Sequence, residues 1–356
     1  MVFHRSVVRA PGQAGRRPDT ARVHPALRLI ADRQLGVFTS GDARRAGYRD
    51  DQMRSALASG VWTRLRRGVY VETATAARLG AGPRGRHLLA SVAVLVSLGG
   101  GPVLSHASAA RLHRFVLPRE DAEVVRLTDS AQWRAGRGYR VARAVLPDDD
   151  AQPFLRFRAT TPARTLVDCA REWTLVDSVV AMDAALHVKV VGRPLLRAAV
   201  HAARHWVGVG TAARALSLAD GRAESPLETR GRLALLAAGL PAPELQVEIH
   251  GPRGFVGRVD AWYDDAALAL EFDGQVKYTD PRDGRSPAQV LWDEKRREDA
   301  VRDLGIRVVR IVNADLGRSW SAVTDRLAAH LADPSPGPRR FTIVRRPEPG
   351  SAPTAA

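Results

Sequence analysis

The sequence predicts a multidomain protein that combines α+β and α/β architecture, and three observations predict it. Residues 24–75 contain three short amphipathic helical segments followed by a basic, alternating run. Residues 84–220 carry both helical and strand-like periodicity, which is typical of a mixed α/β region. Residues 255–274 hold two alternating apolar runs, as expected for a β-hairpin inside an α/β core. A chain of 356 residues is long enough for two or three domains with separate cores.

Composition narrows the classes of protein to consider. The single cysteine, Cys169, excludes internal disulfides and cysteine zinc clusters, so we expect a reducing, cytoplasmic environment. No apolar run approaches the roughly 20 residues of a membrane span, so no membrane partner is expected. Residues 1–23 are rich in arginine without an apolar core segment, which predicts a disordered basic arm rather than an export signal. Residues 334–356, rich in Pro, Arg and Ala, predict a disordered tail.

Charge is distributed unevenly along the chain. The net charge is +16, and residues 1–220 hold 34 Arg and Lys against 18 Asp and Glu. Residues 221–333 hold 16 against 19. A basic surface attracts phosphate backbones through counterion release, so nucleic acid is the expected partner of the first 220 residues. An arginine-rich genome composition would explain the total charge equally well, but it explains the segregation poorly.

The first helices and the run that follows them predict a winged helix-turn-helix. Residues 24–36 read as one helix, and Ser40 is a suitable N-cap for a second helix that ends at Gly47. A third runs from about Arg49 to Ser59 and is also ended by a glycine. Residues 61–71 then alternate like a short hairpin with a basic face.

This order, closed by Arg66-Arg-Gly-Val-Tyr70, resembles the N-terminal domain of abortive-infection type IV antitoxins of the AbiEi kind. The resemblance implies double-stranded DNA as a partner and a cognate toxin protein as a second one. It places the third helix in the major groove and the wing at phosphates or the minor groove. The implied groove-facing residues are Arg49, Gln52, Arg54 and Ser55, and the implied wing residues are Arg64, Arg66 and Arg67.

The middle region, residues 84–220, resembles the remainder of the antitoxin-like module and shows no catalytic set. Helices are expected at 86–98, 105–113, 161–170, 175–187, 193–205 and 211–218, with strands at 123–127 and 139–146. His106 and His113 could be functional, but histidines at helical spacing in an apolar segment are usually packed and hydrogen-bonded. We therefore favour a structural role for both.

Three carboxylates mark the hairpin within residues 255–274. A two-residue turn at Asp264-Asp265 would place Asp260 opposite Ala269. Strand alternation then puts Asp260, Glu271 and Asp273 on one face, with Leu268, Leu270 and Phe272 on the other. Like charges this close repel unless a cation lies between them, and a divalent metal with oxygen ligands is the simplest such partner.

The pattern Asp260 followed by Glu271-x-Asp273 resembles the core of the PD-(D/E)XK nucleases, in the branch of very-short-patch-repair (Vsr-like) endonucleases. The resemblance covers roughly residues 221–333 and implies a restriction-endonuclease-like α/β core. It also implies Asp260 and Glu271 as ligands of Mg²⁺ or Mn²⁺. Asp273 stands where the family usually has lysine, a departure common in this branch.

Two further residues carry alternative interpretations. Ser225, Pro226 and Glu228 form a capping box at the start of a helix, which explains Glu228 fully. The nuclease resemblance implies a catalytic role for it instead. Lys295 lies one turn from Asp299 and could pair with it, or it could be the displaced catalytic lysine of the family.

Two functions remain open at this stage. The first is DNA binding coupled to Mg²⁺-dependent phosphodiester hydrolysis by an endonuclease-like domain, in defence or DNA repair. The alternative is a non-catalytic DNA-binding transcriptional regulator, the antitoxin of a type IV toxin–antitoxin system. Asp260 and Glu271 favour the enzyme, whereas Asp273 in the lysine position favours the regulator.

Overall fold

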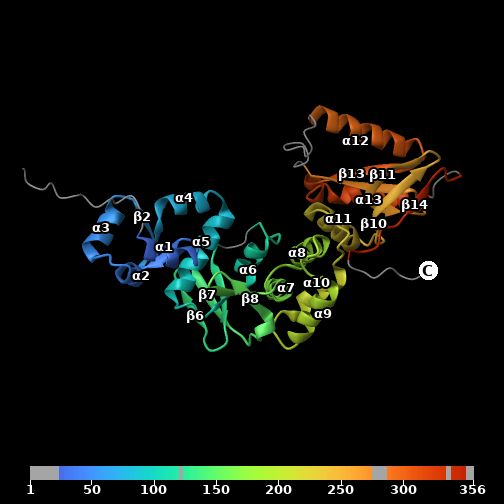
Figure 1. The fold of residues 1–356 in the computed structure, drawn as a ribbon. Coiled ribbons are helices and arrows are strands. Elements are labelled where there is room, and N and C mark those ends of the chain that lie inside the picture. The colour runs from blue at the N-terminus through green and yellow to red at the C-terminus, as the bar shows by residue number, and fades with distance from the viewer. Residues whose placement is uncertain (1–23, 120–122, 275–286, 334–337, 350–356) are drawn as a thin grey trace, which may run out of the picture. The chain divides into compact units, whose positions relative to one another are not determined.

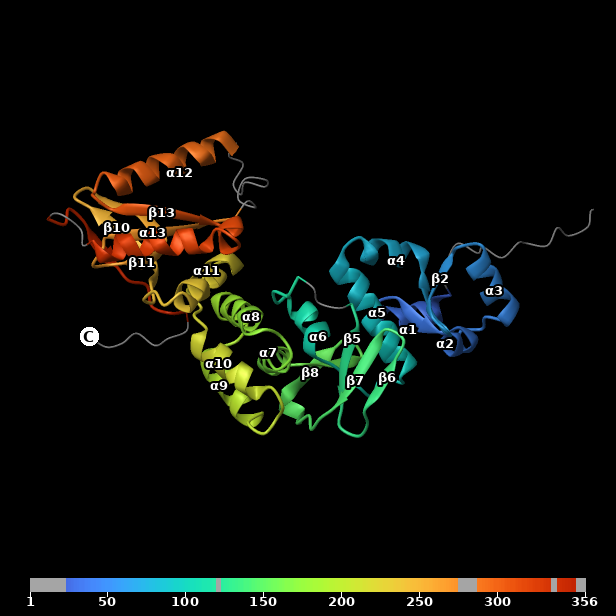
Figure 2. The ribbon, with the colours of Figure 1, turned by 180° about the vertical axis from the view of Figure 1, so that it is seen from behind.

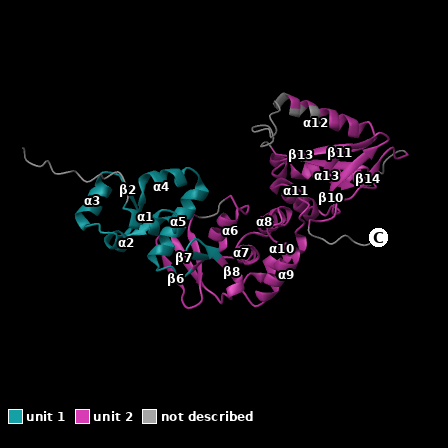
Figure 3. Ribbon diagram, in the orientation of Figure 1, with its two compact units in different colours: residues 1–102, 153–158 teal, residues 103–152, 159–356 magenta. Residues whose placement is uncertain are grey.

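The computed structural model describes residues 24–119, 123–274, 287–333 and 338–349. The chain divides into two compact units, residues 1–102 with 153–158, and residues 103–152 with 159–356 (Figure 3). The basic arm expected at residues 1–23 lies outside the described residues.

The first unit contains the expected winged-helix order of elements. Its sheet is antiparallel in the order β1-β3-β2. The elements are α1 (Pro25–Asp32), β1 (Val37–Thr39), α2 (Ser40–Arg45), α3 (Asp50–Ala58), β2 (Trp62–Arg66) and β3 (Val69–Glu72). Two further helices follow, α4 (Thr73–Gly80) and α5 (Pro83–Ser97). The cap of α2 was predicted one residue too late, because Thr39 and Asp42 form the capping box.

An aromatic cluster holds the winged helix together. Phe38, on β1, meets Trp62, on β2, edge to face with ring centroids 4.7 Å apart. Tyr48 lies 5.0 Å from the same indole ring. Leu27 and Met53 complete this core from α1 and α3. Because Met53 is buried at 6% exposure, the opposite side of α3 must face water.

The middle region combines a six-stranded mixed sheet with a helical layer (Figure 2). The sheet order is β6-β7-β5-β4-β9-β8. The strands are β4 (Val103–Leu104), β5 (Val125–Asp129), β6 (Arg134–Gly136), β7 (Tyr139–Arg143), β8 (Ala151–Phe154) and β9 (Phe157–Thr160). The helices are α6 (His106–His113), α7 (Pro162–Ala170), α8 (Leu175–His187), α9 (Arg193–Ala202) and α10 (Val209–Leu218). Their apolar faces share one core that includes Leu166, Met182 and Leu196.

The C-terminal region is a five-stranded sheet with helices on both faces (Figure 1). Its order is β13-β12-β11-β10-β14; β12 and β13 run parallel, and the other neighbouring strands run antiparallel. The strands are β10 (Glu244–Gly251), β11 (Gly254–Tyr263), β12 (Leu268–Asp273), β13 (Arg307–Val312) and β14 (Thr342–Val344). The helices are α11 (Pro226–Ala237), α12 (Pro287–Arg302) and α13 (Trp320–Ala332).

The turn of the predicted hairpin differs from the expectation. Four residues, 264–267, connect β11 to β12, and Ala269 pairs with Trp262 rather than with Asp260. Leu268, Leu270 and Phe272 do share one core, as alternation requires. The two-residue turn was wrong because Ala266 and Ala267 are buried and complete the loop instead of extending the strand.

The predicted disordered tail is also partly wrong. Thr342–Val344 forms β14, which pairs antiparallel with β10 over Glu248–His250. Phe341 packs edge to face on Trp262, with ring centroids 5.7 Å apart. Three tail arginines, Arg339, Arg345 and Arg346, pair with Asp264, Glu244 and Glu248. The composition of the tail could not predict this strand, because the strand forms by pairing with the uncovered edge of β10 and with acidic residues far away in the sequence.

Candidate functional site

The exposed side of α3 carries the residues expected at the major groove. Arg54 and Ser55 are exposed, whereas Met53, between α3 and the core, is buried. Gln52 is half-buried, and its side-chain oxygen accepts a 2.8 Å hydrogen bond from the backbone N–H of Arg49. Gln52 therefore fixes the start of the helix, which the sequence reasoning did not assign to it.

Ion pairs neutralise the start of α3 but not its centre. Arg49 makes two 3.1 Å hydrogen bonds to Asp51, which lower the pKa of the Asp51 carboxyl. Arg44 pairs with Asp50 at 3.0 Å. Within the described part of the chain Arg54 has no carboxylate partner. Arg54 is therefore the guanidinium on this helix that is available for an external anion.

The wing is present, but its arginines do not follow one face. Arg64 pairs with Tyr70, and Arg66 pairs with Val69, because a β-bulge inserts Leu65 between them. Strict alternation would have put Arg64 and Arg66 on the same side, so the expectation of one basic face was wrong. Arg64 and Arg67 are exposed, while Arg66 is half-buried. The wing thus presents positive charge in more than one direction.

The two histidines of α6 are packed, hydrogen-bonded groups. His106 contacts Ser105 Oγ at 2.8 Å through Nδ1 and lies 3.6 Å from Glu172 through Nε2. His113 contacts the carbonyl oxygen of Thr160 at 2.8 Å. Burial lowers the pKa of both imidazoles. Both therefore have partners that account for them structurally.

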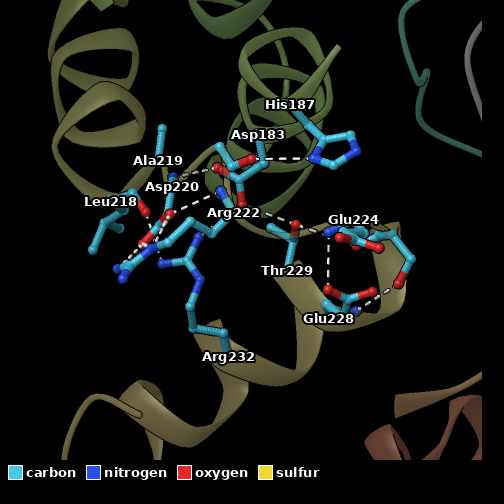
Figure 4. Close-up of polar contacts among 12 residues, drawn as sticks. Asp183, His187, Leu218, Ala219, Asp220, Arg222, Glu224, Glu228, Thr229 and Arg232 are labelled. Carbon is cyan, nitrogen blue, oxygen red and sulfur yellow. Dashed lines mark hydrogen bonds and ion pairs between the residues drawn. The ribbon is translucent and has the colours of Figure 1, made fainter. Parts of the chain in front are cut away.

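A buried ion pair joins the helical layer to the C-terminal region (Figure 4). Asp183, on α8, is 1% exposed and accepts hydrogen bonds from Arg232 Nη2 at 2.8 Å and Thr229 Oγ1 at 2.9 Å. The backbone N–H of Asp220 donates to the same carboxylate at 2.6 Å. Burial raises the pKa of Asp183 to about 6 despite these donors. Sequence reasoning missed this junction because no local pattern links α8 to α11.

Asp260 lies at an irregular point of the C-terminal sheet. It accepts hydrogen bonds from the backbone N–H of Phe272 at 2.8 Å and from Gln246 Nε2 at 3.4 Å. Gln246 has a positive φ of 54° and also donates to Glu228 at 2.9 Å. The Glu228 pKa is raised by burial and by the charge of Asp260. Two carboxylates therefore meet around one amide.

Glu228 itself caps α11 in a different way from the expectation. Ser225 Oγ accepts from the backbone N–H of Glu228 at 3.2 Å, as a capping box requires. The Glu228 carboxylate, however, accepts from the backbone N–H of Glu224 at 2.8 Å instead of that of Ser225. The predicted box is therefore half formed, and Glu228 turns toward Gln246 and Asp260.

Arginines compensate the other two carboxylates. Glu271 lies 3.9 Å from Arg297, and Asp273 lies 3.1 Å from Arg310. Lys295 is exposed on α12 and, among the residues that the structure describes, forms no ion pair with Asp299. In the described ranges, no three His, Cys, Asp or Glu side chains are placed to hold a metal ion. Guanidinium groups thus place positive charge beside Glu271 and Asp273, and the binding of Mg²⁺ or Mn²⁺ stays a prediction.

No helix in the described part of the chain is long and apolar enough to cross a membrane. Cys169 is a buried thiol in the helical layer. The cytoplasmic location stays a prediction.

The winged helix matches a known protein family. Residues 25–73 match the family model described as "Transcriptional regulator, AbiEi antitoxin". The match supports the N-terminal module and a DNA-binding regulator role. The chain is also 34% identical over 246 residues to "Uncharacterized protein Rv2248" of Mycobacterium tuberculosis strain H37Rv. The same values hold for "Uncharacterized protein MT2308" of strain CDC 1551, and each alignment covers 68% of this chain and 87% of the relative.

Proposed function

Because the chain belongs to the same family as these two M. tuberculosis proteins and carries an AbiEi-type regulator domain, we propose that it is a DNA-binding transcriptional regulator of the antitoxin class. The observation that carries this proposal is the surface of α3. Arg54 and Ser55 are exposed on α3, and Arg54 has no carboxylate partner among the described residues.

The docking mode follows from the shape of the winged helix. The exposed side of α3 enters the major groove, where Arg54 reads base edges by bidentate hydrogen bonds, most favourably to guanine. Arg64 and Arg67 contact phosphates on the flanking strands, and the bulge at Leu65 spreads these contacts over two directions. Arg49 stays paired with Asp51, so it helps to hold the start of α3 in place and does not contact a base.

The direct test is selection of binding sites from random duplexes by the full-length chain, followed by footprinting. A defined motif whose preference changes in Arg54→Ala supports the proposal. Asp51→Ala is a useful comparison, because it releases Arg49 and should strengthen binding to all sequences. Absence of any duplex binding at low salt would rule out the proposed function.

A protein toxin is the second partner that we propose for this class of regulator. The proposal is tested by co-expression with the product of the adjacent gene, with growth as the readout. Rescue that persists in a variant without DNA binding, such as Arg54→Ala with Arg64→Ala and Arg67→Ala, separates neutralisation from repression of transcription.

Metal-dependent phosphodiester cleavage is a second candidate function. It is favoured by the meeting of Glu228 and Asp260 around Gln246, with a raised Glu228 pKa. The pairing of Glu271 and Asp273 with arginines disfavours it. A plasmid-nicking assay with Mg²⁺ or Mn²⁺ tests it directly. Cleavage lost in both Asp260→Asn and Glu271→Gln would establish the enzyme, and no cleavage of any DNA form would exclude it.

A further inference from the structure

The middle region contains a strongly basic hairpin, and the winged helix gives no reason for its charge. We call residues 133–143 the arginine hairpin; it comprises Trp133, β6, a two-residue turn and β7. It carries four exposed arginines, and residues 130–147 contain no Asp or Glu. The arginines are Arg134, Arg137, Arg140 and Arg143.

The hairpin is built to hold its shape. Gly136 pairs with Tyr139, and the turn uses Gly138 at a φ of 75°, which a residue with a Cβ rarely adopts. The Tyr139 ring, 7% exposed, covers Gly136 so closely that a Cβ there would lie 2.4 Å from the ring. The positions of the arginines are therefore fixed by the backbone rather than by a flexible loop.

The arginines lie on both sides of this ribbon. Arg140 pairs with Ala135 and shares its side, while Arg134 pairs with Val141 and lies on the other. β6 is the terminal strand of its sheet, so one long edge of the hairpin has no neighbouring strand in the sheet order. β7 pairs with β5 on its other side, so the hairpin is the border of the six-stranded sheet, and its uncovered edge and its turn are the parts that can meet a ligand.

Three of the four arginines of the hairpin, Arg134, Arg140 and Arg143, carry the argument. Within the described residues Arg134, Arg140 and Arg143 have no carboxylate partner. Asp129 is the neighbour of Arg143 in the β5–β7 register, yet its carboxylate accepts hydrogen bonds from the backbone N–H groups of Ala131 and Gln132. Trp133, beside these charges, is 70% exposed.

We propose that the arginine hairpin is a second DNA-binding element, which contacts the sugar–phosphate backbone of duplex DNA through Arg134, Arg140 and Arg143. The inference rests on the proposed function in taking DNA as the ligand, but it concerns a site outside residues 25–73. The uncovered edge and the turn of the hairpin can approach a groove of duplex DNA, and phosphates line both walls of that groove. Guanidinium groups on both sides of the ribbon match that arrangement, and Trp133 adds an aromatic surface for the sugars.

The test compares salt dependence of binding in the full-length chain. The variant Arg134→Ala, Arg140→Ala, Arg143→Ala removes three phosphate contacts, so the slope of log K against log salt should become less steep by about 3. The matched control is Arg197→Ala, Arg214→Ala, Arg326→Ala, which removes the same charge from exposed arginines elsewhere. Its slope should stay close to that of the unaltered chain. Equal melting temperatures show that the variants are folded.

The outcomes separate this inference from the proposed function. If the slope of log K against log salt is unchanged in the hairpin variant but reduced in Arg64→Ala with Arg67→Ala, the hairpin does not bind DNA and the winged helix does. No DNA binding by the unaltered chain overturns both. A second measurement uses fluorescence: Trp133→Phe should lose most of the quenching caused by DNA. Trp292→Phe, which removes another exposed indole at 64%, should keep it.

Discussion

The carboxylate of Asp260 accepts a 2.8 Å hydrogen bond from the backbone N–H of Phe272. The paired part of β11 and β12 ends at Ala261 and Leu270, so the N–H of Phe272, two residues further along β12, receives its acceptor from a side chain. Asp260 therefore takes the place of a backbone acceptor at an irregular point of the ladder. Its role in holding the sheet together can be measured independently of any catalysis.

Replacing Asp260 by Ala should lower the free energy of unfolding by about 1–3 kcal/mol, because the buried Phe272 N–H loses its acceptor. Asp260→Asn keeps a carbonyl oxygen and should cost less. Urea denaturation measures both, with exposed Asp265→Ala as the control. Equal stability of the Ala and Asn variants would show that this hydrogen bond contributes little.

Changes on α3 and on the wing should affect DNA binding differently. Arg54→Ala should relax preference at one base pair, at about 1–3 kcal/mol, because it removes a base contact. Arg64→Ala with Arg67→Ala should weaken binding to all sequences alike and reduce the salt slope by about 2. Competition binding with matched and mismatched duplexes measures both effects. A uniform loss in Arg54→Ala would assign that residue to the backbone instead.

Stability near pH 5 should depend on Asp183. Its pKa is about 6 in the folded chain against an ordinary value of 3.8, so the folded state binds this proton more tightly. Lowering the pH from above 6 to below 4 should therefore stabilise the protein, relative to Asp183→Asn, by about 3 kcal/mol. Denaturation of both proteins across this range isolates the effect, since the remaining carboxyl groups are common to both. Parallel curves would place the Asp183 pKa at its ordinary value.

The segment that contains Phe341 and β14 should contribute to the stability of the protein. Phe341→Ala removes a ring that is 8% exposed and packs on Trp262, which should cost about 3–5 kcal/mol. Phe255→Ala, at 62% exposure, is the control and should be nearly neutral. Thermal melting followed by circular dichroism gives the comparison. A melting temperature unchanged by Phe341→Ala would mean that the contact between Phe341 and Trp262 does not contribute to stability.

Local patterns anticipated most of the helices. Thr161 was expected to cap α7, and its side chain does accept from the backbone N–H of Arg164. The helix Leu175–His187 was predicted with its observed ends, because caps and apolar spacing lie within a few residues of each other. The order of helices and wing in residues 24–75 was confirmed for the same reason.

The surroundings of the candidate site residues were harder to predict from local sequence patterns. Alternation correctly separated Leu268, Leu270 and Phe272 from their neighbours, but it could not show what compensates the carboxylates. Arg297 and Arg310 reach Glu271 and Asp273 from α12 and β13, at sequence separations that no motif encodes. Likewise, the bulge at Leu65 depends on the partner strand, so the sequence of the wing alone suggested a single basic face.

The buried pair between Asp183 and Arg232 bears on how this family can recombine. A crossover near residue 220 would place Asp183 and Arg232 in sequences of different origin, and a mismatched partner would leave one charge buried alone. The contact between Arg193 and Glu348 would be divided by the same crossover. A crossover near residue 102 divides neither pair. Exchange of DNA specificity between relatives should therefore proceed by grafting the winged helix with α4 and α5, together with residues 153–158, which belong to the same compact unit.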